Sequence, residues 1–291
     1  MVSLAVVPED NKAATNMSKA LHRFTREDPT FRTSQDPETG DTIISGMGEL
    51  HLEVYIERIK REFNAVVTTG APQVKYRETI TQTVEFDYTH KKQTGGSGQY
   101  AKVQGLMEPN DEGDFEFESK VVGGRIPTEY IGACKKGFEL SIPEGQYIGA
   151  PVQGMKVTML DGNSHAVDSS DMAFQTACRA AFREFYGRGK PVALEPLMLV
   201  SIEGPGEYQG DIIKTLMRRR GVIVGTTEDG GFVRVDANVP LAEMFGYATV
   251  LRSSTQGKAE FTMEFARYAP APREVAEELV KEYVEKKSQG K

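Results

Sequence analysis

The order of predicted strands and helices at the two ends of the chain restricts its fold more than any other feature. Residues 1–74 predict strand, helix, strand, strand, helix, strand, and residues 197–269 predict the same order. This order is typical of the split βαβ, or ferredoxin-like, unit. The segment between them, 75–196, predicts a different sheet with two helices. We therefore expect an α+β protein in which two ferredoxin-like βαββαβ domains flank a distinct α/β domain, followed by a C-terminal helix at 270–291.

Apolar spacing supports the predicted helices. In the helix expected at 49–63, Leu52, Ile56, Ile59 and Phe63 step by 4, 3 and 4 residues, which places them on one helical face. In the helix expected at 171–186, Phe174, Ala177, Ala181 and Phe185 step by 3, 4 and 4 residues, which also places them on one face.

Glycine positions predict where two helices end and where one hairpin turns. We expect Gly187 to end the helix at 171–186 and Gly221 to end a helix at 207–220 that buries Met217. Glu228–Gly231 predicts a hairpin turn.

Composition narrows the class of protein. The chain has 291 residues, 39% of them hydrophobic, and a net charge of −7, which speaks against non-specific wrapping of duplex nucleic acid. No apolar run approaches the length of a membrane span, and the N-terminus does not resemble a signal peptide. A strand-like run begins directly after Met1, so we expect a piece of a longer protein. Cys134 and Cys178 are expected to be buried, reduced thiols.

A histidine is presented on a short loop in the middle domain. The stretch 160–168 follows a predicted strand and precedes a predicted helix, and its Asp161-Gly162-Asn163 predicts a turn. Asp168, Ser169 or Ser170 can cap the helix. His165 is therefore a candidate recognition residue, although an ordinary loop histidine would give the same pattern.

A second loop, at 91–102, is rich in glycine, basic, and free of acidic residues. It lacks the phosphate-loop pattern, so a nucleotide site is not expected there. A cationic glycine loop that also carries glutamine and tyrosine suits contact with RNA, and a plain hairpin tip fits equally well. We expect the two loops to lie side by side.

Five cations in the third domain are further candidates for RNA contact. Arg218, Arg219 and Arg220 end a predicted helix, where the helix dipole alone also accounts for positive charge. Arg252 and Lys258 add to the RNA interpretation. No nucleophile triad, acid pair, or His/Cys cluster at zinc spacing occurs in the sequence, so we expect no catalytic residue and no metal site on this chain.

Several motifs along the chain are long and distinctive: FTREDPTF at 24–31, ISGMGELHLE at 44–53, YRETI at 76–80, QTGGSGQY at 93–100, VDSS at 167–170 and PLAEMFGY at 240–247. They resemble the motifs of translation elongation factor G, and the resemblance covers nearly the whole chain. The residues at 87–94 and Arg267-Tyr268 are most similar to those of the mitochondrial and spirochaete-type translocation factors.

The resemblance implies domains III (1–74), IV (75–196) and V (197–269) of that family, with the final helix packing on domain IV, whose fold is ribosomal-protein-like. The GTPase domain and domain II would be missing, so this chain alone should not hydrolyse GTP, and GTP and Mg would bind only in the absent part.

The resemblance also implies partners and contacts. A monomer would bind both ribosomal subunits, with domain V on ribosomal RNA, and would promote movement of tRNA and mRNA from the A site. Its place would be the cytoplasm, or alternatively the mitochondrial matrix. The implied tRNA and mRNA contacts are Lys92, Gln93, Thr94, Gly95, Gly96, Ser97, Gly98, Gln99, Tyr100, Asp161, Gly162, Asn163, Ser164 and His165.

Two positions depart from the family pattern, and two other functions stay open. Many bacterial members have arginine in place of Ser97 and an aromatic residue in place of Ser164. A sister factor specialised for ribosome recycling is one alternative. A stand-alone regulatory or interaction protein that uses ferredoxin-like domains is the other.

Overall fold

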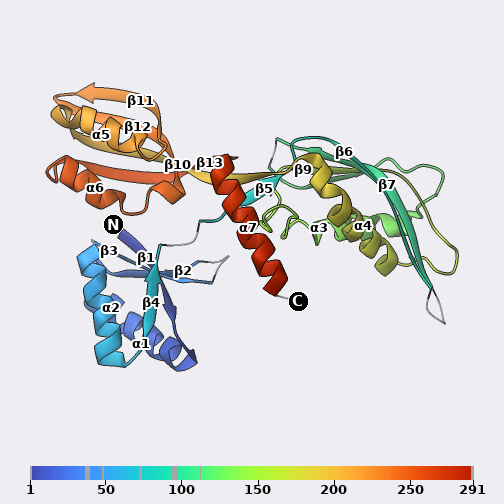
Figure 1. Ribbon diagram of the computed structural model, residues 1–291, viewed down its shortest axis with the longest axis horizontal. Helices are drawn as coiled ribbons and strands as arrows, with labels where there is room; N and C mark the ends of the chain where they lie inside the picture. The colour runs from blue at the N-terminus through green and yellow to red at the C-terminus, as the bar shows by residue number, and fades with distance from the viewer. Residues whose placement is uncertain are drawn as a thin grey trace. The chain divides into compact units, whose positions relative to one another are not determined.

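The computed structural model describes residues 2–36, 40–47, 49–71, 74–93, 98–111 and 113–289 (Figure 1). The chain divides into two compact units, one made of 1–75 and 196–267 and the other of 76–195 and 268–291. Buried side chains of the described residues form three separate hydrophobic clusters, one for each predicted domain. The α+β fold class predicted from the sequence is confirmed.

The first domain is an antiparallel sheet with two helices, in the predicted βαββαβ order. Its sheet order is β2-β3-β1-β4. Asp10 caps α1 by accepting a hydrogen bond from the N–H of Ala13 at 2.6 Å. Phe24, Ile44 and Ile59 are fully buried in its core. The elements are β1 (Val2–Pro8), α1 (Asn11–Glu27), β2 (Arg32–Gln35), β3 (Thr42–Gly46), α2 (Glu49–Phe63) and β4 (Val67–Gly70).

The third domain repeats this architecture with the sheet order β11-β12-β10-β13. Gly230 and Gly231 form the β11–β12 turn with φ of 56° and 84°, the left-handed conformations that such two-residue turns require. The predicted hairpin turn is therefore confirmed. The elements are β10 (Val192–Pro205), α5 (Gln209–Met217), β11 (Val222–Asp229), β12 (Phe232–Pro240), α6 (Tyr247–Ser254) and β13 (Glu260–Pro270), with 3₁₀ turns at Gly206–Tyr208 and Leu241–Glu243.

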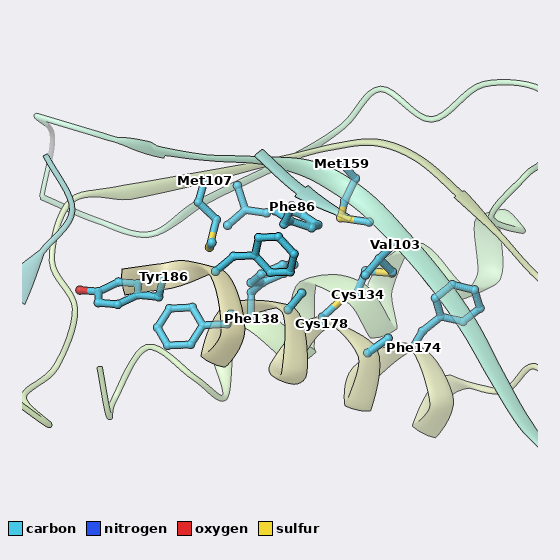
Figure 2. Close-up of a cluster of buried hydrophobic side chains, with 14 of the residues drawn as sticks. Phe86, Val103, Met107, Cys134, Phe138, Met159, Phe174, Cys178 and Tyr186 are labelled. Carbon is cyan, nitrogen blue, oxygen red and sulfur yellow. The ribbon is translucent and has the colours of Figure 1, made fainter. Parts of the chain in front are cut away.

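The middle domain packs α3 and α4 together and against a sheet of order β6-β7-β9-β8. Figure 2 shows its core, in which Phe174 and Cys178 of α4 point towards Val103 and Met159 of the sheet. Both cysteines are free and fully buried, as predicted. The elements are β5 (Arg77–Thr79), β6 (Val84–Lys92), β7 (Gln99–Pro109), β8 (Glu116–Ser119), α3 (Thr128–Glu139), β9 (Met155–Asn163), α4 (Asp171–Phe185), a 3₁₀ turn at Tyr186–Gly189 and α7 (Arg273–Gln289).

Several predicted element ends are wrong. Gly187 does not end α4, because the chain continues as a 3₁₀ turn, and Lys190 takes the left-handed conformation with φ of 47°. After α5 the left-handed residue is Arg220, with φ of 58°, in place of Gly221. Met217 is 64% exposed, although its spacing predicted burial.

A buried carboxylate joins β5 to the loop at 143–151. Glu78 is fully buried, and its carboxylate accepts hydrogen bonds from the N–H groups of Tyr147 (3.1 Å), Ile148 (2.8 Å) and Ala150 (3.3 Å). A Cβ added at Gly145 would lie 1.8 Å from Glu78 Oε1, so only glycine fits there. Burial raises the pKa of Glu78, and the three N–H groups oppose that rise by stabilising the charged form.

The C-terminal helix contacts the same loop. The Tyr283 hydroxyl of α7 donates a hydrogen bond to the carbonyl of Gly145 at 3.3 Å. The Tyr283 ring also lies where a side chain at Gly149 would be, because a Cβ added there would come within 2.4 Å of it. The loop therefore has Glu78 on its inner side and α7 against it.

A second hydrogen-bonded cluster fixes the start of α2 in the first domain. His51 Nδ1 accepts from the N–H of Met47 at 3.1 Å, so Nε2 carries the hydrogen and donates to Asp28 Oδ2 at 2.8 Å. Asp28 also accepts hydrogen bonds from Thr30 and Tyr55. These bonds, led by those from Thr30, hold the pKa of Asp28 well below its usual range.

Replacing Glu78 should loosen the middle domain. In Glu78→Gln an amide N–H₂ group faces backbone N–H donors, so we expect a loss of about 1–3 kcal/mol of unfolding free energy. Urea denaturation measures this loss, and hydrogen exchange at Tyr147, Ile148 and Ala150 locates it. Glu85→Gln is the control, because Glu85 is exposed on β6, the next strand along the chain. Equal unfolding midpoints for the two variants would contradict the role of Glu78.

The first domain should lose stability in acid because the folded-state pKa of Asp28 is depressed. The contribution of Asp28 is present above the ordinary aspartate pKa and is lost as the pH falls below it. Asp28→Asn should remove this part of the pH dependence between about pH 4 and 2. Hydrogen exchange in α2 at several pH values tests this expectation. Glu53→Gln, an exposed change on the same helix, should keep the wild-type slope.

Candidate nucleic-acid interface

The first candidate loop is shorter than the sequence indicated. β6 extends to Lys92 and β7 starts at Gln99, so Lys92, Gln99 and Tyr100 belong to paired strands. His90 Nε2 and Gln99 Oε1 lie 2.8 Å apart, which engages the Gln99 side chain within the hairpin. Gln93 and Gly98 stand at the ends of the loop. The predicted contacts Thr94, Gly95, Gly96 and Ser97 lie outside the described residues.

The predicted turn at Asp161-Gly162-Asn163 is wrong, because β9 continues through these three residues and pairs with β7. Side-chain contacts typical of turns are present, since Asn163 Oδ1 accepts from the N–H of Ser164 at 2.9 Å. Pairing with β7 nevertheless determines the backbone. A Cβ added at Gly162 would lie 2.4 Å from the carbonyl oxygen of Lys102, so glycine allows the strands to approach. The presented loop is therefore 164–170.

The structure brings the two loops together through a cluster of hydrogen bonds, which we call the loop junction. The Asp168 carbonyl accepts from the N–H of Tyr100 at 2.8 Å, and Asp168 Oδ1 accepts from the N–H of Gly98 at 3.0 Å. Ser169 Oγ donates to the Tyr100 carbonyl at 2.7 Å and accepts from the N–H of His165 at 2.8 Å. The loop that carries His165 is thus attached to the end of the β6–β7 hairpin.

Sequence reasoning assigned Asp168 and Ser169 only as alternative helix caps. Ser170 is the cap, because its hydroxyl accepts from the N–H of Ala173 at 3.2 Å. The two preceding polar side chains are therefore available to bond across to β7. Three consecutive candidate caps before one helix were the signal that two of them had another role.

His165 is exposed while one of its ring nitrogens is engaged. Its side chain is 55% exposed. Nδ1 lies 3.3 Å from the N–H groups of both Val167 and Asp168, and 3.4 Å from Asp168 Oδ2. Nε2 has no partner among the described residues. The Tyr100 ring lies 6.3 Å away in an edge-on arrangement. The loop thus presents a polar ring edge, and an aromatic ring next to it, to a ligand.

Two neighbours support this arrangement from the rest of the middle domain. Arg125 Nη1 pairs with Asp161 Oδ2 at 2.5 Å. The Tyr130 hydroxyl donates to the Ser169 carbonyl at 3.4 Å. Together with the loop junction, these contacts hold the polar groups in fixed positions, which suits recognition of a polyanion by positioned donors.

The five candidate cations of the third domain fall into two groups. Arg219 donates to the carbonyls of Glu243 and Phe245, Arg220 pairs with Glu243 at 3.1 Å, and Lys258 pairs with Glu207 at 3.2 Å. These bonds give the three cations a role within the fold. Arg218 and Arg252 have no ion pair among the described residues.

Neither a metal site nor a membrane span is found in the described part of the chain. Within the described ranges, no group of three His, Cys, Asp or Glu side chains could hold a metal ion. No helix among the same residues is long and apolar enough to cross a membrane.

Comparison with protein families gives three matches in sequence order. The model of "Elongation Factor G, domain III" matches residues 1–71, that of "Elongation factor G, domain IV" matches 72–190, and that of "Elongation factor G C-terminus" matches 192–279.

Individual relatives agree with the family matches. "Elongation factor G 1" of Syntrophus aciditrophicus is 58% identical over 287 residues, which is 99% of this chain and 41% of the relative. "Elongation factor G 1" of Treponema pallidum is 57% identical with the same coverage. A crystal structure of a protein from Thermus thermophilus matches with a TM-score of 0.85 and 37% identity, over 98% of this chain and 43% of that one. The chain thus spans about two fifths of these relatives.

Removing one hydroxyl should loosen the loop junction without unfolding the domain. In Ser169→Ala the His165 N–H loses its acceptor and the Tyr100 carbonyl loses a donor. One hydrogen bond contributes about 0.5–1.5 kcal/mol, so amide exchange at His165 should be roughly 2- to 10-fold faster. Hydrogen exchange followed by NMR measures this rate. Ser164→Ala is the control, because no hydrogen bond of the Ser164 hydroxyl is present among the described residues. Unchanged exchange at His165 would contradict the assigned bond.

Proposed function

The chain belongs to the elongation factor G family, and from this premise we propose that it is the ribosome-binding part of a factor that moves tRNA and mRNA through the ribosome. Three observations support the proposal: the three family matches in order, the ferredoxin-like domains around a different middle domain, and the paired loops of that domain. The middle domain would enter the decoding site of the small subunit. The outer domains would bind ribosomal RNA and protein.

The exposed ring of His165 on a loop that is bonded to β7 is the observation that carries this proposal. A contact residue must be both exposed and fixed in position, because each side chain that is ordered on binding costs free energy. His165 meets both conditions. Its Nε2 would bond to RNA, Lys92 would pair with a phosphate, and Tyr100 would offer a ring for stacking.

The proposed mechanism involves positioning and no bond-making by this chain. The two loops would hold the codon–anticodon pair as it leaves the A site, so that the pair moves together with the factor. GTP hydrolysis would provide the driving force from a domain outside this chain, where GTP and Mg would bind. We accordingly assign no catalytic residue here.

Arg218 and Arg252 are the stronger candidates for the ribosomal RNA contacts of the third domain. Their charges are not paired within the described part of the chain, so RNA phosphates would not compete with internal partners. Arg219, Arg220 and Lys258 would have to give up internal bonds to make the same contact.

The alternatives receive less support. A ribosome-recycling factor would use the same fold, and a subunit-splitting assay run beside a translocation assay separates the two activities. A stand-alone interaction protein does not account for three consecutive matches to one family. The relatives named above come from bacteria, which supports the cytoplasm as the proposed place of the activity, with the mitochondrial matrix as the alternative.

Removal of the His165 ring should slow translocation. The test uses a chimera in which this chain replaces the corresponding segment of the Treponema pallidum relative, which is 57% identical. Loss of one hydrogen bond of about 1.4 kcal/mol in the transition state would make single-round translocation in His165→Ala about tenfold slower. Ribosome-stimulated GTP hydrolysis should persist.

Val167→Ala is the matched control, since Val167 is 74% exposed on the same loop and offers no polar group. Its rate should equal that of the unmodified chimera. A His165→Ala chimera that translocates at the unmodified rate would refute the role given to His165.

A further inference from the structure

Two exposed arginines of the middle domain have no ion-pair partner in the part of the chain that the structure describes. Arg179 and Arg183 stand one turn apart on α4, and both are exposed. Neither has an ion pair among the described residues. On other helices an arginine pairs with a glutamate four residues later, as in Arg58–Glu62 and Arg273–Glu277. On α4 an arginine stands at that distance from another arginine, so two like charges are held close together.

These arginines line a small hollow of about 70 Å³ between α4 and the segment that follows α3. Ser141 and Gln146 also line it and add polar groups. One carboxylate, that of Glu144, is present in the lining. The hollow is therefore polar, cationic, and large enough only for a small group.

The ordinary explanation for these cations is incomplete. A positive charge in the last turn of a helix is stabilised by the helix dipole, which accounts for Arg183. The effect declines within one turn, and Arg179 stands six residues before the helix end at Phe185. The helix dipole therefore does not stabilise the charge of Arg179, and no ion pair within the described residues does so either.

We propose that Arg179 and Arg183 form a second RNA-contacting surface, which binds backbone phosphates on the side of the middle domain, away from the His165 loop along α4. This proposal rests on the proposed function for the partner and adds a site to it. Guanidinium groups bind phosphate oxygens through two parallel N–H bonds. α4 begins directly after the His165 loop, so at 1.5 Å per residue the two arginines lie roughly 12 and 18 Å along the helix from Asp171.

A polyanion fits this surface better than a folded protein does. Protein interfaces have apolar, aromatic-rich centres. The lining of the hollow contains one exposed large apolar side chain, Leu140, at 51% exposure, while Phe182 is buried in the core. Phosphate contacts of this kind position a protein on RNA and carry no sequence information, which suits the side of a domain whose tip makes the specific contacts.

The test measures how binding depends on salt. The chimera described above is bound to ribosomes with a non-hydrolysable GTP analogue at several salt concentrations. The binding constant K falls as salt rises, and each phosphate contact contributes about 0.7–0.9 to the steepness of log K against log salt. Arg179→Gln with Arg183→Gln should therefore reduce that steepness by about 1.4–1.8. Arg179→Lys with Arg183→Lys keeps both charges and should keep the slope.

The control removes two charges elsewhere on the same compact unit. Lys281→Gln with Lys286→Gln on α7 changes the net charge equally and should leave the slope unchanged. An unaltered slope in the double arginine variant would overturn the proposal. An equal decrease in the lysine control would also overturn it, because the effect would then follow from net charge alone.

A second measurement identifies the partner. Thr176 lies on the same stripe of α4, seven residues before Arg183, and both native cysteines are buried. In a chimera whose other segment has its cysteines replaced by serine, Thr176→Cys can therefore carry a hydroxyl-radical source selectively. Cleavage of RNA near this probe is the expected result. Oxidation confined to ribosomal proteins would identify an acidic protein as the partner and would refute the assignment of RNA. Because these measurements concern binding, a negative result for His165 in translocation would leave them unaffected.

Discussion

The arrangement of the middle domain depends on the hydrogen bonds that the buried carboxylate of Glu78 accepts. A buried carboxylate costs free energy unless donors surround it, and here three N–H groups of one loop supply them. Gly145 provides the space, and Tyr283 contacts the outer side of the same loop. One charged group therefore fixes the β5 strand, the 143–151 loop and, through that loop, the place where α7 packs.

At the loop junction, polar groups also fix the position of a loop, on a smaller scale. Asp168 and Ser169 use side-chain and backbone oxygens to connect the His165 loop to β7. Ser170 caps α4, which leaves those two side chains available. Position at the tip is thus determined by short polar contacts, while the apolar core shown in Figure 2 provides the rigid support behind them.

The sequence predicted the parts of the fold that depend on local periodicity. The βαββαβ order, the spacing of Leu52 and Ile59, and the glycine turn at 230–231 all follow from short-range chemistry, and each is present. The resemblance to a known family identified the chain, but residues alone left the role of His165 open between recognition and an ordinary loop position.

The errors occurred where distant partners decide the outcome. Asp161-Gly162-Asn163 has turn propensity, but β7 pairs with it and makes it strand. Met217 has core spacing, but α5 ends at this residue and leaves it exposed. The loop junction could not be predicted because Gly98 and Asp168 are 70 residues apart, and nothing in either segment specifies the other.

The contact between α7 and the 143–151 loop has a consequence for the order in which the protein is made. The middle unit consists of 76–195 and 268–291, so the residues of an entire further domain are synthesised before its last helix exists. Domains generally fold as the chain emerges, N-terminal parts first. The loop held by Glu78 therefore lacks its Tyr283 contact until α7 has been synthesised, and the docking of that helix completes the contacts described for the middle unit.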